Sequence, residues 1–224
     1  MSALSESLDE RGWAMLPALV DHSSCRALAA RWDEEALFRK RVAMERHAYG
    51  QGEYRYFAYP LPELVQSLRR SLYRELAPVA NRWREALRLP GGFPPELETY
   101  LEKCHAAGQT KPTPLVLRYE EGGYNCLHQD LYGDEVFPLQ ATVLLSDPAR
   151  DFGGGEFLLV EQRPRAQSRG EVVPLAQGDA VVFATRERPR RGPRGFQRVQ
   201  LRHGVSRVRA GLRFTLGLIF HDAA

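Results

Sequence analysis

Cysteine is scarce in this chain. Only Cys25, Cys104 and Cys126 occur among 224 residues, and they are odd in number and widely spaced. This pattern excludes a disulfide framework and argues against a zinc site built of thiolates. We therefore expect buried, reduced thiols.

Long apolar runs are also absent. No stretch approaches the roughly 18 apolar residues that a transmembrane helix needs. Residues 1–11 mix serine and glutamate with leucine and have neither the basic nor the apolar region of a signal peptide. We expect a cytoplasmic protein with no membrane partner.

The overall composition is that of a folded globular protein, with 43% hydrophobic and 26% charged residues. The net charge of +3 is too small to indicate a class of partner. The length suits one core with an annex. We predict one domain, with a helical N-terminal annex in residues 1–110 and a β-rich core in residues 111–224.

The N-terminal half predicts one strand, three helices and, over residues 49–59, a loop or a pair of strands. Residues 12–17 read as a strand, and Asp21 offers an N-cap for a helix that would run towards Arg46. Leucines at spacings of three and four predict a second helix over residues 63–89, with Pro78 inside it. Pro94 and Pro95 open a third helix that ends near Gly108.

From Lys111 onwards the pattern changes to short β-rich runs separated by turn residues. This is typical of a double-stranded β-helix, or jelly roll, packed on the preceding helices, and the fold class is therefore α+β. The expected strands cover residues 115–119, 124–130, 137–145, 156–161, 171–174, 180–184, 198–203 and 212–221.

His128 and Asp130 stand two positions apart in one expected strand, so their side chains share a face. An imidazole and a carboxylate so placed can form two corners of a 2-His-1-carboxylate iron site. A pair of this kind also occurs by chance and as an ordinary surface pair. For the third ligand we choose His203, because His221 is three residues from the end, where fraying is common.

Arg213 and Thr215 share a face of the last expected strand. A guanidinium that points into a barrel needs an anionic partner, because an unpaired buried charge is costly. That partner is either the carboxylate of a ligand, with a hydrogen bond from Thr215, or a protein carboxylate in a structural salt bridge.

Together, His128, Asp130, His203, Arg213 and Thr215 resemble the 2-oxoglutarate/Fe(II) dioxygenases, whose fold is the jelly roll. The resemblance implies that the two histidines and the aspartate bind Fe(II). It implies that Arg213 and Thr215 hold the distal carboxylate of 2-oxoglutarate, and that O2 is the oxidant.

Within this superfamily, the segment from Arg118 to Asp130 is similar to that of AlkB-type nucleic-acid demethylases. The similarity implies that Tyr119 touches the cosubstrate. The segments 151–157, 161–165 and 202–207 resemble a bacterial oxygenase family thought to act on alkylated DNA. Two features depart from the AlkB type: the spacing from His203 to Arg213 is closer to prolyl-hydroxylase-like members, and residues 1–110 contain no recognisable base-flipping lid.

Arginines crowd the segment before His203, among them Arg190, Arg191 and Arg194. Such a cluster near an active site would suit phosphate contacts, although a solvated basic loop is an equal alternative. Proline and glycine predict an irregular segment that could act as a flap. Tyr132 and Asp134 are also placed to reach the substrate, although a turn role is the alternative for Asp134.

The resemblance implies a dioxygenase whose substrate is alkylated DNA or RNA, single-stranded or with the base flipped, and whose reaction is oxidative demethylation. Two alternatives stay open. One is a hydroxylase of a protein side chain or small molecule, and the other is a non-enzymatic jelly-roll binder of a metal or oxo-acid. The sequence does not define the oligomeric state.

Overall fold

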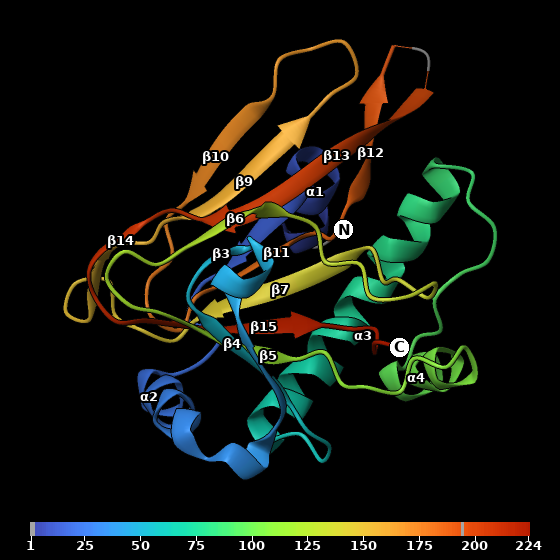
Figure 1. Ribbon diagram of the computed structural model, residues 1–224. Coiled ribbons are helices and arrows are strands. Elements are labelled where there is room, and N and C mark those ends of the chain that lie inside the picture. Colours follow the sequence, from blue (N-terminus) through green and yellow to red (C-terminus); the bar gives the residue numbers. More distant parts are fainter. Residues whose placement is uncertain (1–2, 194) are drawn as a thin grey trace.

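The computed structural model describes residues 3–193 and 195–224. Two antiparallel sheets form its centre, as the sequence predicts for a jelly roll (Figure 1). The larger sheet has seven strands, in the order β1 (Trp13–Leu16), β11 (Ala180–Ala184), β7 (Leu139–Leu144), β15 (Arg213–Ile219), β5 (Leu115–Tyr119), β4 (Glu53–Phe57) and β2 (Phe38–Ala43).

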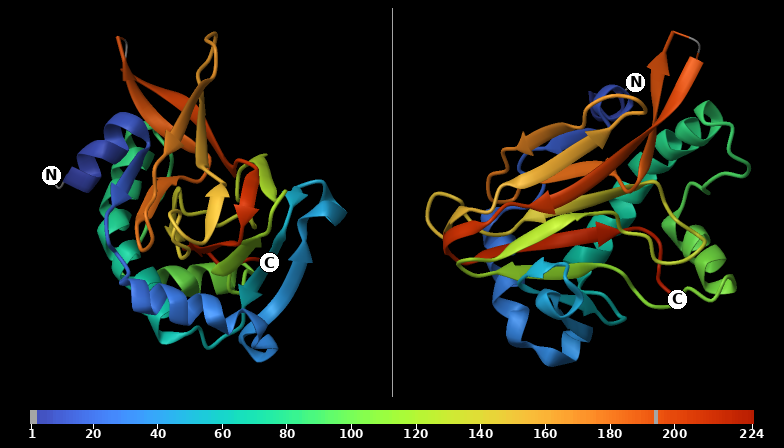
Figure 2. Two further views of the ribbon diagram at one scale, coloured as in Figure 1. Left: turned by 90° about the vertical axis from the view of Figure 1, so that its left-hand side faces the viewer. Right: turned by 45° about the horizontal axis from the view of Figure 1, so that its top comes forward.

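The smaller sheet has six strands. Its path runs β10 (Arg169–Val173), β9 (Phe157–Gln162), β13 (Gly195–Val205), β6 (Tyr124–His128) and β3 (Gly50–Gln51), and β12 (Glu187–Gly192) pairs with β13. The short strands β8 (Phe152–Gly154) and β14 (Val208–Gly211) form a separate pair. The two hairpins β9–β10 and β12–β13 project together from the body of the molecule (Figure 2).

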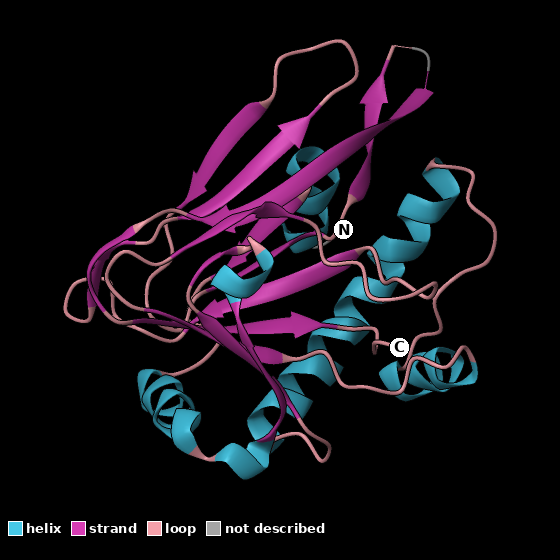
Figure 3. Ribbon diagram, in the orientation of Figure 1, coloured by secondary structure: helices cyan, strands magenta, loops and turns pink. Residues whose placement is uncertain are grey.

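Four α-helices belong to the N-terminal half: α1 (Ala3–Arg11), α2 (His22–Ala30), α3 (Glu63–Ala86) and α4 (Leu97–Ala106). Helix α3 lies across one face of the larger sheet (Figure 3). Its residues Leu72 and Leu76 belong to the same buried cluster as Val143 and Leu216 of the sheet. Burial of this apolar face leaves the opposite face of the larger sheet to line a cavity.

The helix expected from Asp21 to Arg46 is wrong beyond Ala30. Asp21 caps α2 as predicted, because its side chain accepts a hydrogen bond from the Ser24 amide. After three-residue 3-10 turns at Arg31–Asp33 and Glu35–Leu37, the chain enters β2, and a further 3-10 turn covers Met44–His47. Pairing with β4 makes the chain extended here, a non-local contact that overrides the helical spacing.

Strands β1 to β4 all lie before residue 110, so both sheets include strands from the N-terminal half. β1 lies within the strand expected over residues 12–17, and β3 and β4 lie within the segment 49–59, expected as a loop or a pair of strands. The arginine-rich segment was expected to be irregular. This expectation is wrong, because β12 and β13 form a regular antiparallel hairpin. β12 is an edge strand whose described partner is β13. Proline is tolerated at such an edge, because a residue there can do without an N–H group on its unpaired side.

None of the described helices is long and apolar enough to cross a membrane.

Candidate functional site

His128, Asp130 and His203 come together as one group. His128 ends β6, and His203 of β13 is its direct partner across the antiparallel ladder. The Nε2 atom of His203 lies 3.3 Å from Oδ2 of Asp130, and Nε2 of His128 lies 3.6 Å from Oδ1. One ligand atom from each residue falls within 4.8 Å of the others. His221 is not part of this group.

Hydrogen bonding leaves a nitrogen of His128 free for a metal. Its Nδ1 lies 2.8 Å from the backbone carbonyl of Cys126, which can only accept a hydrogen bond, so Nδ1 carries the proton. The lone pair of Nε2 then faces Asp130. Fixing the ring through its other nitrogen is the usual support for a metal-binding histidine.

His203 is held in an apolar wall. Its ring centroid lies 4.7 Å from that of Phe183 and 6.0 Å from that of Phe157. Burial, followed by the nearby charge of His128, lowers the pKa of His203 below its ordinary value of 6.5. The imidazole is therefore neutral at pH 7, as metal binding requires.

Asp130 is 9% exposed and remains ionised. Burial acts to raise its pKa, but the hydrogen bond with His203, the two histidine charges and a hydrogen bond from Tyr132 together lower it. The Tyr132 hydroxyl donates to Oδ1 of Asp130 at 2.7 Å. Tyr132, expected to reach substrate, thus contacts the carboxylate of the metal group directly.

Arg213 is a buried cation without a carboxylate partner among the described residues. It is 1% exposed, and its one hydrogen bond runs from Nη1 to Oγ1 of Thr215 at 3.3 Å. Its Nε atom is buried with no partner. Burial lowers the pKa of Arg213 to about 10, so the side chain is still charged at pH 7. Of the two partners expected for Arg213, the protein carboxylate is missing.

Tyr119 lies directly opposite Arg213 in the pairing of β5 with β15. The guanidinium carbon lies 5.6 Å from the centre of its ring. The Tyr119 hydroxyl accepts a hydrogen bond from Nδ2 of Asn125 at 3.2 Å and is fully buried. Gly155 packs against Arg213, and a Cβ atom there would approach its Cδ to 2.8 Å. The guanidinium is therefore fixed on several sides.

A cavity of about 410 Å³ between the two sheets joins these groups. It brings together seven of the residues singled out in the sequence: Tyr119, His128, Asp130, Tyr132, His203, Arg213 and Thr215. Sequence reasoning missed Asn125 and Gln140, which also line it. Alternation along β7 gives a signal for Gln140, which shares a face with Thr142, another residue of the cavity. Asn125 lies three positions before His128, so alternation alone would place it on the opposite face; the register shift in the pairing of β6 with β13 breaks that alternation.

The remaining expected site residues lie elsewhere. Asp134 lines an adjoining groove of about 480 Å³ that shares Leu131 with the cavity. Arg190 lines a different groove, and Arg191 is exposed on β12. Arg194 lies outside the described residues. Arg188, another member of the arginine cluster, is 2% exposed and bound to Glu161, so phosphate cannot reach it.

The donor set fits a divalent iron ion and an anionic cosubstrate. Two imidazoles and one carboxylate on one face are the ligands of a 2-His-1-carboxylate iron centre, which leaves the other positions open. The unpartnered Nε of Arg213 supplies a donor for a carboxylate at the other end of the cavity.

The fold is shared with solved 2-oxoglutarate/Fe(II) oxygenases, and the site supplies the ligands that such an iron centre needs. Solved structures agree: a Pseudomonas putida prolyl-4-hydroxylase matches with a TM-score of 0.58 and 16% identity, over 99% of this chain and 98% of the other. A Burkholderia pseudomallei oxidoreductase of the 2OG-Fe(II) oxygenase family matches with a TM-score of 0.53 and 19% identity, over 99% and 91%. The cofactor and cosubstrates expected from the sequence, Fe(II), 2-oxoglutarate and O2, agree with this class.

The chain belongs to the Oxygenase-NA family, described as an oxygenase catalysing oxidative methylation of damaged DNA, whose model matches residues 52–223. Two Mycobacterium tuberculosis relatives, the uncharacterized proteins Rv2227 and MT2286, are each 52% identical over 168 residues. The match covers 75% of this chain and 72% of each relative. The chain is therefore an oxidoreductase, and the alternative of a non-enzymatic binder is not supported.

Proposed function

We propose that this oxygenase removes alkyl groups from damaged bases of single-stranded or flipped-out nucleic acid. In this proposal His128, Asp130 and His203 hold Fe(II), and Arg213 with Thr215 holds the distal carboxylate of 2-oxoglutarate. Tyr119 supports Arg213 in this role, since its ring lies beside the guanidinium and its hydroxyl is held by Asn125.

When bound, Fe(II) supplies the site at which O2 is reduced while 2-oxoglutarate loses CO2 and becomes succinate, and one oxygen atom enters a substrate C–H bond. On a methyl group attached to a ring nitrogen, this gives a hydroxymethyl group. That group leaves as formaldehyde and restores the base. The protein contributes orientation: Arg213 fixes one end of the cosubstrate, and the two histidines with Asp130 fix the other.

The observation that carries the substrate proposal is the mouth of the cavity. Tyr49, Leu127 and Leu131 line the cavity and are 50%, 41% and 42% exposed. They are three of the six large hydrophobic residues that are exposed in the described part of the chain. An exposed apolar and aromatic rim suits a flat base, which stacks on aromatic side chains once it leaves the helix.

Positive charge lies beside this rim. The groove that adjoins the cavity at Leu131 carries Arg84, Arg186 and Arg198 against Asp134 and Glu187. Arg191, on the projecting β12–β13 hairpin, is exposed and has no ion-pair partner among the described residues. Arg84, Arg186 and Arg198 can contact the phosphates next to a base held at the mouth. Arg191 pairs with Phe196, which lies seven residues from His203 on β13, a distance of about 23 Å along the strand. Arg191 can therefore reach only phosphates further along the nucleic acid, and all such binding weakens as salt rises.

The decisive experiment measures succinate and formaldehyde released from a single-stranded oligonucleotide that contains one N1-methyladenine. We expect equal amounts of both products, and no formaldehyde from the unmethylated oligonucleotide. Formation of hydroxyproline in a proline-rich peptide, with no product from any methylated oligonucleotide, would replace this proposal with the protein-hydroxylase alternative.

Variants of the rim add a structural test. Tyr49→Ala should raise the KM for the methylated oligonucleotide about tenfold, since loss of one base stack costs about 1–3 kcal/mol. Val172→Ala is the matched control, because Val172 is 55% exposed on β10 and does not line the cavity. Equal effects of both changes would remove Tyr49 from the substrate site.

A further inference from the structure

Gln140 is a buried polar residue that faces the cavity without a partner for its amide nitrogen. It is 2% exposed, lines the cavity, and its Nε2 atom makes no hydrogen bond with any residue that the structure describes. We propose that Gln140 recognises the substrate, by donating a hydrogen bond to an acceptor atom on the edge of the damaged base. This inference rests on the proposed function.

The two other buried glutamines differ from Gln140, because the Nε2 atom of each donates a hydrogen bond within the protein. Nε2 of Gln109 donates to the carbonyl oxygens of Glu135 and Asp222, and Nε2 of Gln177 donates to that of Leu145 at 2.7 Å. Neither residue lines the cavity. The Oε1 atom of Gln177 is also buried without a partner, but Gln177 lies away from the cavity. A buried donor without a partner costs about 1–3 kcal/mol, and at Gln140 the adjoining cavity allows a ligand to supply that partner.

The position of Gln140 in the sheet places it near the metal group. On β7, Leu139 and Ala141 belong to the core cluster that packs with α3, so Gln140 between them points to the opposite face. Its partner across the ladder is Phe183, whose ring centroid lies 4.7 Å from that of His203. The amide therefore lies in the wall beside the proposed iron ligands.

The pairing of β7 with β15 separates Gln140 from Arg213 and Thr215, the two residues proposed to hold the cosubstrate. On the other side of β7, Gln140 pairs with Ile219, whereas Thr215 pairs with Leu144. Four residues of an extended strand cover about 13 Å, which is longer than 2-oxoglutarate. A cosubstrate held by Arg213 and Thr215 thus ends before Gln140, and the amide is left for the molecule that enters on the other side of the metal group.

The chemistry of a damaged base matches an amide donor. A carbonyl oxygen or an unprotonated ring nitrogen next to the alkylated position would accept the hydrogen bond from Nε2. A site that hydrogen-bonds one substrate edge rejects molecules that lack it, since the buried donor would again be unpaired. Gln140 would therefore help to select among bases, while the rim at Tyr49 would hold any base.

The test compares Gln140→Met, which keeps the size and removes the donor, with Gln177→Met as a matched buried control. For a single-stranded oligonucleotide that contains one N3-methylcytosine, whose C2 carbonyl oxygen lies beside the methylated nitrogen, Gln140→Met should raise KM about tenfold, the loss of one hydrogen bond of about 1.4 kcal/mol. The affinity for 2-oxoglutarate, titrated without oxygen through its visible charge-transfer band with Fe(II), should stay within about twofold, which also shows that the variant is folded. Gln177→Met should lower thermal stability and leave both constants unchanged.

Each other outcome overturns the proposal in a distinct way. An equal loss of 2-oxoglutarate affinity would assign Gln140 to the cosubstrate, and a change in melting temperature alone would assign it to the core. An unchanged oligonucleotide KM in Gln140→Met, with an active wild type, would overturn the role of Gln140 and leave the proposed function standing. No turnover of methylated oligonucleotides by the wild type would overturn both. Gln140→Glu, which places an acceptor where the donor stood, should raise KM further than Gln140→Met.

Discussion

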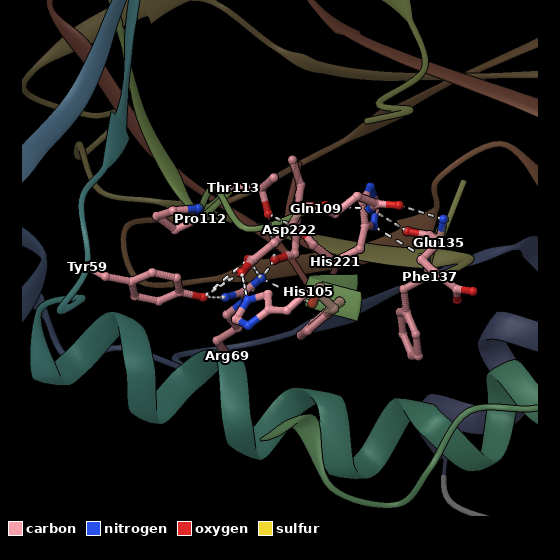
Figure 4. Close-up of polar contacts among 12 residues, drawn as sticks. Tyr59, Arg69, His105, Gln109, Pro112, Thr113, Glu135, Phe137, His221 and Asp222 are labelled. Atoms are coloured by element: carbon pink, nitrogen blue, oxygen red, sulfur yellow. Dashed lines mark hydrogen bonds and ion pairs between the residues drawn. The ribbon is translucent and has the colours of Figure 1, made fainter. Parts of the chain in front are cut away.

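Two buried arginines, Arg69 and Arg213, have different surroundings. Arg69 is fully buried and donates to the carbonyl oxygens of Ile219 and Phe220, to the Tyr59 hydroxyl and to Oδ1 of Asp222 at 2.8 Å (Figure 4). Arg213 is equally buried, but among the residues that the structure describes it donates only to Thr215, at 3.3 Å, and its Nε has no partner there.

The difference separates a structural cation from a ligand-binding one. The charge of Arg69 is neutralised by Asp222, which also accepts a hydrogen bond from Tyr59 and lies 2.9 Å from Nε2 of His105. Its network joins α3 to the end of the chain and is complete without a ligand. Arg213 lies in a cavity wall and lacks a counter-ion, so its burial is compensated only when an anion binds.

Removal of Arg69 should give the largest effect on folding. Arg69→Met leaves Asp222 buried and without its cationic partner, so the free energy of unfolding should fall by about 3–5 kcal/mol. The measurement is urea denaturation. The affinity of the folded fraction for 2-oxoglutarate should be unchanged, because Arg69 does not line the cavity.

A double-mutant cycle sharpens this comparison. Combining Arg69→Met with Asp222→Asn removes both charges and should recover part of the lost stability. If the two changes simply add, the ion pair at 2.8 Å does not couple Arg69 to Asp222, and the contrast with Arg213 weakens.

Removal of Arg213 should reduce ligand binding and not folding stability, which is the opposite of the result expected for Arg69. Arg213→Met should weaken 2-oxoglutarate binding by about 3 kcal/mol, at least 100-fold, because two charge-assisted hydrogen bonds are lost. Fe(II) affinity should change little. The ligand-free variant should be at least as stable as the wild type, because an uncompensated buried charge is removed. A large loss of stability without loss of 2-oxoglutarate affinity would place Arg213 in the same class as Arg69.

The sequence predicted those parts of the site that depend on short spacing. Arg213 and Thr215 are two positions apart in β15, so strand alternation alone places them on one face. His128 and Asp130 have the same spacing and come together as expected, although β6 ends at His128 and Asp130 lies just beyond it. The sequence also predicted β5 and β11 with their observed bounds. Strand β2, strand β12 and the pairing of β12 with β13 were not predicted, because contacts between strands decide them, whereas the expected strand over residues 198–203 lies within β13.

The Arg69 network could not be predicted for the same reason. Arg69 and Asp222 are 153 positions apart, and no local pattern links them. The expectation that the chain frays at His221 is wrong: His221 and Asp222 are 0% exposed, and Lys111 pairs with Ala223 in an isolated bridge. The choice of His203 over His221 agrees with the geometry, although the fraying argument behind it does not hold.

The Arg69 region should also make the protein sensitive to acid. Burial, followed by the charge of Arg69, lowers the pKa of His221 to about 4. Between pH 6.5 and 4 the unfolded chain binds a proton at this position and the folded chain does not, so stability falls as the pH falls. From pH 7 to 4.5 the loss due to His221 should be about 2–3 kcal/mol. Urea denaturation at both pH values measures it.

His221→Asn provides the control for this prediction. It keeps an acceptor for the Phe137 amide, which donates to Nδ1 of His221 at 3.3 Å, and removes the titrating ring. The variant should be less stable at pH 7, and its stability should depend less on pH than that of the wild type. An unchanged slope would show that other groups cause the sensitivity to acid.

The smallest predicted effect concerns the metal end of the Arg213 cavity. Tyr132→Phe removes the hydroxyl that donates to Oδ1 of Asp130 at 2.7 Å and keeps the ring contacts with Tyr56 and His221. Loss of a hydrogen bond to a metal ligand lowers affinity about 10-fold to 100-fold, and we expect the lower value because Oδ2 still contacts His203. Fe(II) affinity, titrated without oxygen, should therefore fall about tenfold, while 2-oxoglutarate affinity at saturating Fe(II) should remain within about twofold.

The reverse result, with unchanged Fe(II) affinity and a higher KM for the oligonucleotide, would return Tyr132 to the substrate role first expected from the sequence. In that case Arg213 would still hold the cosubstrate at one end of the cavity, and the two histidines alone would orient Asp130 at the other end.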